Sequence, residues 1–209
     1  MAYTVKSIFM TLQGEGHNTG RAAVFCRFAG CNLWTGRERH RPSAVCKFCD
    51  TDFVGTDGPG GGRFASADLL ADDIVARWRG SALPFIVLTG GEPTLQLDAA
   101  LLQALHERGA EVAIETNGTH AVSAAVDWIC VSPKSGAPFV QRSGDELKVA
   151  WPQEGIDLEA LERLPFAHRW LQPIDGPRLA DHVRAVLREC RGRPEWRPSF
   201  QMHKLIGIA

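Results

Sequence analysis

Short apolar runs recur along this chain, and stretches with helical spacing lie between several of them. The run at residues 24–29 favours a buried strand, and residues 3–10 favour a partner strand before it. Similar runs recur in the second half of the chain, and each favours a strand: residues 85–88, 112–114, 128–131, 146–149 and 168–171.

Apolar positions three or four residues apart predict helices between these strands. One helix is expected after Ser66, a suitable N-cap, and others over residues 97–108, 158–164 and 178–190. Strands that alternate with helices favour parallel βαβ units. Five or six strands are too few for a complete eight-fold barrel, which needs about 250 residues. We therefore predict an α/β fold, a partial (incomplete) TIM-like barrel of about six parallel strands with a reduced set of helices.

Polar residues follow the predicted strands at their carboxyl ends, where parallel α/β folds place functional groups. Thr89-Gly90-Gly91-Glu92-Pro93 combines glycines, which allow close backbone approach, with a carboxylate that can accept from an ammonium. A plain strand-to-helix turn explains the glycines and the proline but does not require Glu92. A common turn also explains Glu115-Thr116-Asn117-Gly118, and a solvated loop explains Ser132-Pro133-Lys134. A later run ends in Gln172-Pro173-Ile174-Asp175.

Composition limits the classes of partner. The 209 residues, 44% hydrophobic and 22% charged, suffice for one core, so we expect a single domain over residues 1–209. A formal net charge of −1 provides no basic field, so we expect no nucleic-acid partner. No segment resembles a signal peptide or reaches transmembrane length, so we expect no membrane association and a cytoplasmic location.

Three of the six cysteines, Cys31, Cys46 and Cys49, are close in sequence, and three thiolates leave one position of a four-ligand metal site open. The sequence has no second Cys-x-x-Cys pair, which a four-cysteine zinc site requires. His17 or His40 can instead complete a zinc site of three cysteines and one histidine. From the cysteines alone, zinc and an iron–sulfur cluster are equally good interpretations, because thiolates suit both metals.

Other polar residues are further candidates. Gln13-Gly14-Glu15 places an amide and a carboxylate in one turn, which suits the edge of a heterocycle, although a surface turn is equally consistent. Arg27 interrupts an apolar strand, so it needs a buried carboxylate or a substrate anion. Thr51 offers a hydroxyl to Mg²⁺ or simply caps a turn. His203 is either a pocket residue or a histidine within a strand.

Taken together, the three cysteines and Gly90-Gly91-Glu92-Pro93 resemble the radical S-adenosylmethionine (SAM) superfamily. More narrowly, the chain resembles the 7-carboxy-7-deazaguanine synthases over nearly its whole length, from Gln13 to Lys204. The motifs that carry this resemblance are Leu12-Gln13-Gly14-Glu15-Gly16, Phe25-Cys26-Arg27-Phe28-Ala29-Gly30-Cys31-Asn32-Leu33, Phe48-Cys49-Asp50-Thr51, Glu115-Thr116-Asn117-Gly118, Ser132-Pro133-Lys134 and His203-Lys204.

The spacing of the cysteines departs from the superfamily pattern. The superfamily usually has three residues between the first two cysteines, whereas fourteen separate Cys31 from Cys46. A cluster needs ligands that are close in space, and a longer loop costs only about 0.6 kcal/mol per doubling of its length. A cluster loop at residues 31–50 is therefore still expected.

The resemblance implies a [4Fe-4S] cluster on the three cysteines, with SAM chelated by the iron that no cysteine holds. It implies reductive cleavage of SAM to a 5′-deoxyadenosyl radical, which abstracts hydrogen from 6-carboxy-5,6,7,8-tetrahydropterin. Ring contraction with loss of ammonia then gives 7-carboxy-7-deazaguanine, an intermediate towards queuosine. The resemblance also implies Mg²⁺, a flavodoxin- or ferredoxin-type electron donor and a homodimer.

Motif by motif, the resemblance implies roles for residues of this chain. We hypothesise that Glu15 and His203 orient the ring or move protons, and Thr51 is expected to bind Mg²⁺. The expected pterin contacts are Leu12, Gln13, Gly14, Arg27 and Thr89. The expected SAM contacts are Phe48, Cys49, Asp50, Gly91, Glu92, Glu115, Asn117, Ser132, Pro133, Lys134, Gln172, Pro173, Ile174 and Asp175.

Two other classes stay open at this point. A different small radical SAM protein, such as a glycyl-radical activating enzyme, would need a protein partner, and the Gln13-Gly14-Glu15 turn argues against it. A zinc-stabilised binding module would hold zinc tightly and would unfold when Cys46 is replaced by alanine.

Overall fold

A single mixed sheet organises the chain in the computed structural model, which describes residues 2–208. Its strand order is β3-β1-β2-β4-β5-β6-β7-β8-β9, so within the described residues β3 and β9 form its two edges and the barrel is open. The strands are β1 (Tyr3–Leu12), β2 (Ala22–Phe28), β3 (Gly62–Phe64), β4 (Phe85–Gly90), β5 (Glu111–Thr116), β6 (Trp128–Val131), β7 (Gly144–Trp151), β8 (Phe166–Pro173) and β9 (Arg197–Pro198).

All neighbouring strands from β2 to β9 are parallel, whereas β1 pairs antiparallel with both β2 and β3. Six of the parallel strands, β2 and β4 to β8, are those that the apolar runs predict, and the two-residue β9 extends the series. The predicted partial barrel is therefore confirmed. Because the strands are parallel, the carboxyl ends of β2 and β4 to β8 meet at one edge of the sheet.

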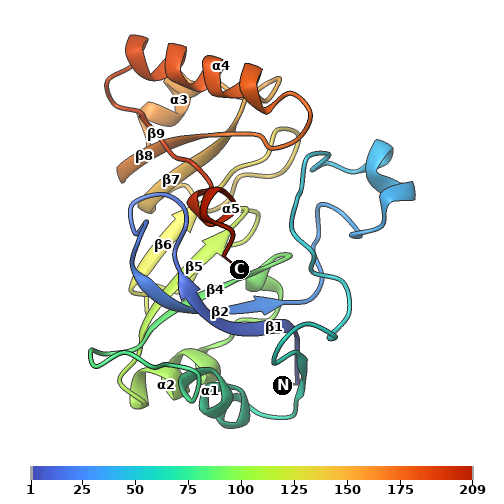
Figure 1. Ribbon diagram of the computed structural model, residues 1–209, viewed down its shortest axis with the longest axis vertical. Coiled ribbons are helices and arrows are strands. Elements are labelled where there is room, and N and C mark those ends of the chain that lie inside the picture. The colour runs from blue at the N-terminus through green and yellow to red at the C-terminus, as the bar shows by residue number, and fades with distance from the viewer. Residues whose placement is uncertain (1, 209) are drawn as a thin grey trace.

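Helices cover only part of the outer face. Figure 1 shows α1 with α2 at one end of the sheet and α3 with α4 at the other. The connections from β5 to β6 and from β6 to β7 contain no helix, which confirms the reduced helix set. The helices are α1 (Ala67–Val75), α2 (Ala99–Glu107), α3 (Leu158–Glu162), α4 (Leu179–Gly192) and α5 (Met202–Ile206), with 3-10 turns η1 (Glu38–Ser43) and η2 (Pro93–Leu95).

Apolar residues at helical spacing bury the inner sides of α1 to α4. Leu70 and Ile74 of α1 and Leu101 and Leu105 of α2 pack in one cluster against β1, β2, β4 and β5. A second cluster joins β7 and β8 to Val186 of α4. Ser66 Oγ accepts from Leu69 N at 3.3 Å, which confirms the predicted N-cap of α1.

The glycine-rich connection at residues 57–62 leads into strand β3 and is held against β1, with Ile8 N donating to Pro59 O at 2.7 Å. One feature differs from the sequence-based expectations. His203 lies in helix α5, not in a strand, because α5 is anchored by Met202 N donating to Gly14 O at 2.9 Å. Across residues 2–208, no helix is both long and apolar enough to span a bilayer.

Candidate active site

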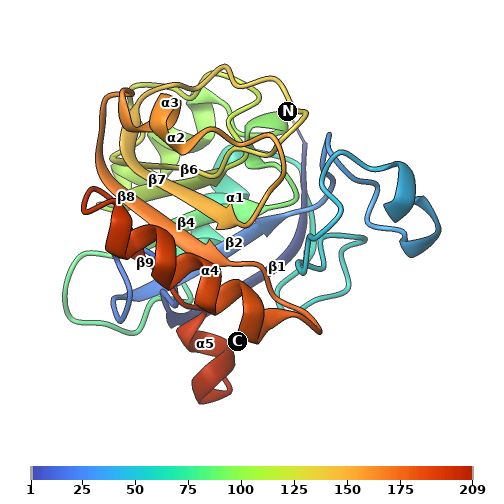
Figure 2. The same cartoon turned by 90° about the horizontal axis from the view of Figure 1, so that it is seen from above.

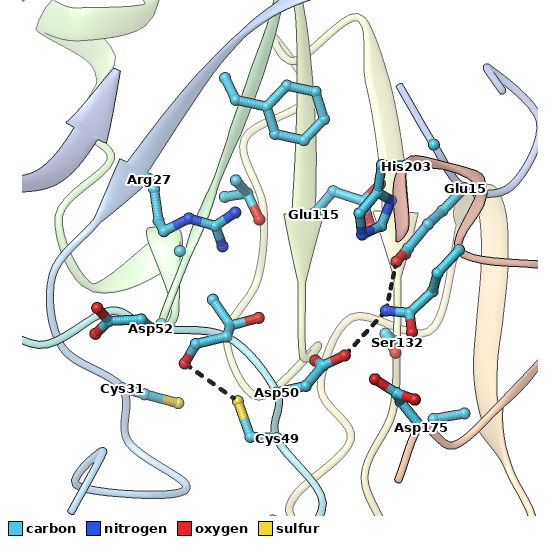
Figure 3. Close-up of a pocket in the computed structure, with 18 of the residues that line it drawn as sticks. Glu15, Arg27, Cys31, Cys49, Asp50, Asp52, Glu115, Ser132, Asp175 and His203 are labelled. Carbon is cyan, nitrogen blue, oxygen red and sulfur yellow. Dashed lines mark hydrogen bonds between the residues drawn. The ribbon is translucent and has the colours of Figure 1, made fainter. Parts of the chain in front are cut away.

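A cavity of about 740 Å³ opens at the edge where the carboxyl ends of the parallel strands meet. Figure 3 shows side chains from distant parts of the sequence facing it, with Arg27 opposite Glu15 and His203. All but two of the residues that the sequence assigns to a site line it. They are Leu12, Gln13, Gly14, Glu15, Arg27, Cys31, Cys46, Phe48, Cys49, Asp50, Thr51, Thr89, Gly91, Glu115, Asn117, Ser132, Lys134, Gln172, Pro173, Ile174, Asp175 and His203.

The three cysteines of the predicted cluster motif all border this cavity as free thiols. Cys31 follows β2, while Cys46 and Cys49 follow η1. A hydrogen bond with the Cys46 thiol outweighs burial and lowers the pKa of Cys49. In residues 2–208, no three histidine, cysteine or acidic side chains are gathered closely enough to hold one metal ion. The three thiols therefore surround a space instead of meeting at one point.

Neither histidine proposed for a zinc site lies at these cysteines. His17 stacks on His168, with the two ring centroids 3.9 Å apart, and on Trp128 at 4.9 Å. His40 lies on η1, and its Nδ1 is 2.8 Å from Thr35 Oγ1. A site of three cysteines and one histidine is thus not assembled within the described residues.

The Gly90-Gly91-Glu92 turn follows β4 and lies directly against the cysteine segment. Gly91 has to be glycine, because a Cβ atom there would come within 1.9 Å of Gly30 O and 3.0 Å of Cys31 Cβ. Glu92 N donates to the same Gly30 carbonyl at 2.9 Å. The turn therefore fixes the backbone just before the first cluster cysteine.

Glu92 is one of the two predicted site residues that do not line the cavity. It is fully buried, and its carboxylate accepts from Thr116 Oγ1 at 2.6 Å and from Asn117 N at 2.8 Å. Thr94 Oγ1 donates to the same carboxylate at 2.6 Å. Through these donors Glu92 holds the end of β5, where Asn117 Nδ2 donates to Asn32 Oδ1 at 2.9 Å.

Pro133 is the second predicted site residue that does not line the cavity. Its carbonyl accepts from Gln153 Nε2 at 3.4 Å, away from the cavity. Its neighbours Ser132 and Lys134 do line the cavity, and Lys134 Nζ donates to Ser132 Oγ at 2.7 Å. Burial lowers the pKa of this lysine, while the nearby cysteines oppose the effect.

A buried lysine that the sequence analysis did not single out organises the opposite side of the cavity. Lys148 Nζ lies 2.9 Å from Glu15 Oε2 and 2.8 Å from Glu115 Oε2. Gln13 Nε2 donates to the other oxygen of Glu115 at 3.2 Å. The alternation of Glu146 and Lys148 in a predicted strand, with apolar residues between them, is a signal for an inward-facing polar row.

Glu15 connects this group to the cysteine segment. Burial opposes its ionisation, but the Lys148 ammonium and the Gln201 amide outweigh burial and lower the Glu15 pKa to about 2. Gln201 Nε2 donates to Glu15 Oε1 and to Asp50 Oδ2, each at 3.0 Å (Figure 3). Lys204 also pairs with both Asp50 and Asp175. Gln201, just before α5, and Lys204, within it, thus connect the loops that carry Glu15, Asp50 and Asp175.

His203 and Arg27 complete the site. A Cβ atom at Gly14 would lie 2.3 Å from His203 Nδ1, so this glycine lets the imidazole approach the backbone. The Arg27 guanidinium, on β2, makes no hydrogen bond or ion pair with another described residue, and burial lowers its pKa. Its guanidinium is therefore available to an anionic ligand.

Comparisons with known proteins decide between the classes. A family model described as the radical SAM superfamily matches residues 39–158. The chain is 59% identical to the 7-carboxy-7-deazaguanine synthase of Bordetella pertussis and 57% identical to that of Bradyrhizobium diazoefficiens, over all of each chain. The chain belongs to the 7-carboxy-7-deazaguanine synthase family of radical SAM enzymes.

A solved structure supports the same assignment. The crystal structure of QueE from Escherichia coli matches with a TM-score of 0.69 at 28% identity, covering 97% of this chain and 95% of that one. Membership of the 7-carboxy-7-deazaguanine synthase family implies a [4Fe-4S] cluster and SAM as cofactors, so the zinc-module interpretation does not hold. The superfamily match begins after Cys31, inside the long segment that separates this cysteine from Cys46.

Proposed function

We propose that the cavity binds SAM beside 6-carboxy-5,6,7,8-tetrahydropterin and converts this pterin to 7-carboxy-7-deazaguanine. The observation that carries the proposal is the placement of three free cysteine thiols and the open Arg27 guanidinium on one 740 Å³ cavity. The thiols suit a cluster with one uncoordinated iron, and the guanidinium suits a carboxylate. The family membership of the chain supports both assignments.

The donor set fits an iron–sulfur cluster better than one metal ion. Cys31, Cys46 and Cys49 all border the cavity, and in a cluster each thiolate can bind a different iron. When bound, the cluster and SAM supply the 5′-deoxyadenosyl radical that removes hydrogen from the substrate. The role of the chain is to hold the three thiols and to keep the radical beside the pterin.

The residues nearest the cysteines are suited to SAM. Gly91 lines the cavity beside Cys31, and Ser132 and Lys134 offer a hydroxyl and a cation. We assign the SAM contacts to these residues and to Phe48, Cys49, Asp50, Glu115, Asn117, Gln172, Pro173, Ile174 and Asp175. Glu92 and Pro133 support this wall from behind it.

The opposite side is suited to the pterin. Arg27 can bind the substrate carboxylate through two parallel hydrogen bonds, and Gln13 offers amide groups to the ring edge. Leu12, Gly14 and Thr89 complete the substrate contacts. Glu15 and His203 lie where they can orient the ring or move a proton, with Glu15 held ionised by Lys148.

Further parts of the proposal concern ions and partners. The Thr51 hydroxyl lines the cavity and suits Mg²⁺, whose other ligands would be substrate and water. A flavodoxin or ferredoxin would supply the electron, and the enzyme would act as a cytoplasmic homodimer. These four points rest on the sequence resemblance.

The test is anaerobic reconstitution with iron and sulfide, followed by turnover with SAM and the carboxylated pterin. We expect a brown [4Fe-4S] protein that forms 7-carboxy-7-deazaguanine with less than one SAM consumed per product. Cys31→Ala should abolish cluster uptake, whereas Cys190→Ala, on α4 outside the cavity, should not. Cleavage of SAM without the deazaguanine product would reject the substrate. Retention of zinc and no cluster would reject the whole proposal.

A further inference from the structure

The fourteen residues between Cys31 and Cys46 form a folded lobe. Figures 1 and 2 both show this blue-to-cyan segment projecting from the sheet, away from α1 to α4. The hydrophobic clusters of the barrel, taken over the described residues, contain no side chain from it. The lobe is held instead by polar and aromatic contacts, among them Asn117 Nδ2 donating to Asn32 Oδ1.

A tryptophan forms the centre of the lobe. Trp34 is 7% exposed and packs edge-on against Phe53, with the ring centroids 5.6 Å apart. Its Nε1 donates to Arg37 O at 3.3 Å. Leu33 O accepts from Val45 N at 3.2 Å and from Cys46 N at 3.4 Å, so the lobe returns to its own start just before the second cysteine.

Arg41 links this centre to the backbone of the Cys-x-x-Cys turn. Its guanidinium lies over Trp34, 4.0 Å from the ring centroid, and pairs with Glu38 through two nitrogens. The remaining nitrogen, Nη1, donates to Lys47 O at 3.0 Å and to Cys49 O at 3.1 Å. A planar guanidinium can make all these contacts at once, whereas a lysine ammonium cannot.

Both carbonyls that accept from Arg41 Nη1 lie in the turn that carries two of the predicted cluster ligands. The carbonyl of Lys47 follows Cys46, and that of Cys49 belongs to a ligand itself, so one nitrogen spans the turn that carries both thiols. The Arg39 guanidinium, two residues earlier, is hydrogen-bonded only to the neighbouring His40 ring among the described residues. Arg39 and Arg41 lie in the same lobe and carry the same charge, but only the Arg41 guanidinium is hydrogen-bonded to the turn.

We propose that Arg41 is a positioning residue that clamps the Cys46–Cys49 turn in place before the cluster binds. The inference rests on the proposed cluster function and extends it to the long cysteine spacing of this chain. The clamp fixes the turn that carries both ligands by hydrogen bonds to the carbonyls of Lys47 and Cys49, and its charge lies beside the site of the cluster. The lobe thus supplies an order that a fourteen-residue loop would otherwise lack.

The experiment compares Arg41→Met, Arg41→Lys and the control Arg39→Met. In the cluster-free protein, amide hydrogen exchange of residues 45–50 should accelerate about tenfold in Arg41→Met, because two hydrogen bonds from a charged donor are lost. Arg39→Met should leave it unchanged. After reconstitution, Arg41→Met should retain several-fold less iron through gel filtration than the parent protein.

The reduction potential of the cluster separates the clamp from simple packing. Loss of a nearby cation should make the potential of Arg41→Met more negative, and Arg41→Lys should restore the potential while leaving amide exchange fast. Unchanged exchange in Arg41→Met, or equal acceleration in Arg39→Met, would overturn the inference. If the parent protein takes up no cluster, the proposed function fails, and amide exchange still tests the clamp. Should Arg41→Met fail to fold, Arg41→Lys provides the same exchange test.

Discussion

The Lys148 ammonium lies 2.8 Å from Glu115 Oε2 in the cavity wall, and only 6% of the lysine side chain is exposed. The same nitrogen lies 2.9 Å from Glu15 Oε2. One buried cation therefore compensates two carboxylates that come from the turn after β1 and from β5. Removing one member of such a group leaves uncompensated charge in the interior, which costs more than the contact itself contributes.

Replacing Lys148 with methionine should destabilise the protein by about 3 kcal/mol at pH 7, because both carboxylates lose their cation. The pKa of Glu15 should rise from its value of about 2. The measurement is urea unfolding of the cluster-free protein. Lys47→Met, at an exposed position, is the control and should change stability by less than about 0.5 kcal/mol. Equal stability of the two variants would contradict the buried-charge argument.

Glu146, two residues earlier on β7, provides a pH-dependent prediction. It is 2% exposed, and burial raises its pKa to about 7 against the attraction of Lys148. Its Oε2 accepts from His17 N at 3.2 Å. The unfolded carboxyl ionises near 4.5, so between pH 4.5 and 7 the unfolded chain loses a proton that the folded chain keeps. Stability therefore falls across this window, by at most about 3 kcal/mol, and this loss levels off above pH 7.

The variant Glu146→Gln should remove this loss, because glutamine carries no titrating proton. Its unfolding free energy, relative to that of the parent protein, should increase as the pH rises from 4.5 to 7 and then stay constant. Chemical unfolding at several pH values measures the difference. A difference that does not change with pH would show that Glu146 is ionised in the folded state.

Much of the barrel could be predicted because its strands are buried on both faces. The continuous apolar runs at residues 85–88 and 128–131 identify strands β4 and β6 without any knowledge of their neighbours. The polar groups that follow them then had to meet at one edge of a parallel sheet. Helix α5 escaped prediction, because its five residues are too short for a period and depend on the distant Gly14 carbonyl.

The positions of individual site residues were harder to predict. Whether Glu92 points into the cavity or behind it depends on Thr116 and Asn117, which arrive from the next strand. The sequence analysis did not single out Lys148, because alternating charged residues in a strand predict one solvent-exposed face. In the partial barrel this face is buried instead. Sequence patterns thus located the strand ends, while the direction of each side chain required the neighbouring strands.

Lys204 should matter more for loop order than for global stability. It bridges Asp50 and Asp175, but the three side chains are 34–38% exposed, so each pair contributes less than about 1 kcal/mol. Lys204→Met should lower the unfolding free energy by less than this amount, and high salt should remove the difference. Amide exchange near residues 50 and 175 should nevertheless increase. A large loss of stability that persists in high salt would indicate a packing role instead.

Arg27 should determine the preference for a carboxylated substrate. Arg27→Gln keeps a hydrogen-bonding group but removes the charge, and we expect kcat/KM for the carboxylated pterin to fall about 100-fold, mainly through KM. Arg27→Lys should recover only part of this, because an ammonium cannot pair with both carboxylate oxygens in one plane. The inhibition constant of a competing tetrahydropterin that lacks the carboxylate should be nearly the same for the parent protein and for Arg27→Gln. If Arg27→Gln weakened both ligands equally, the guanidinium would instead support the shape of the cavity.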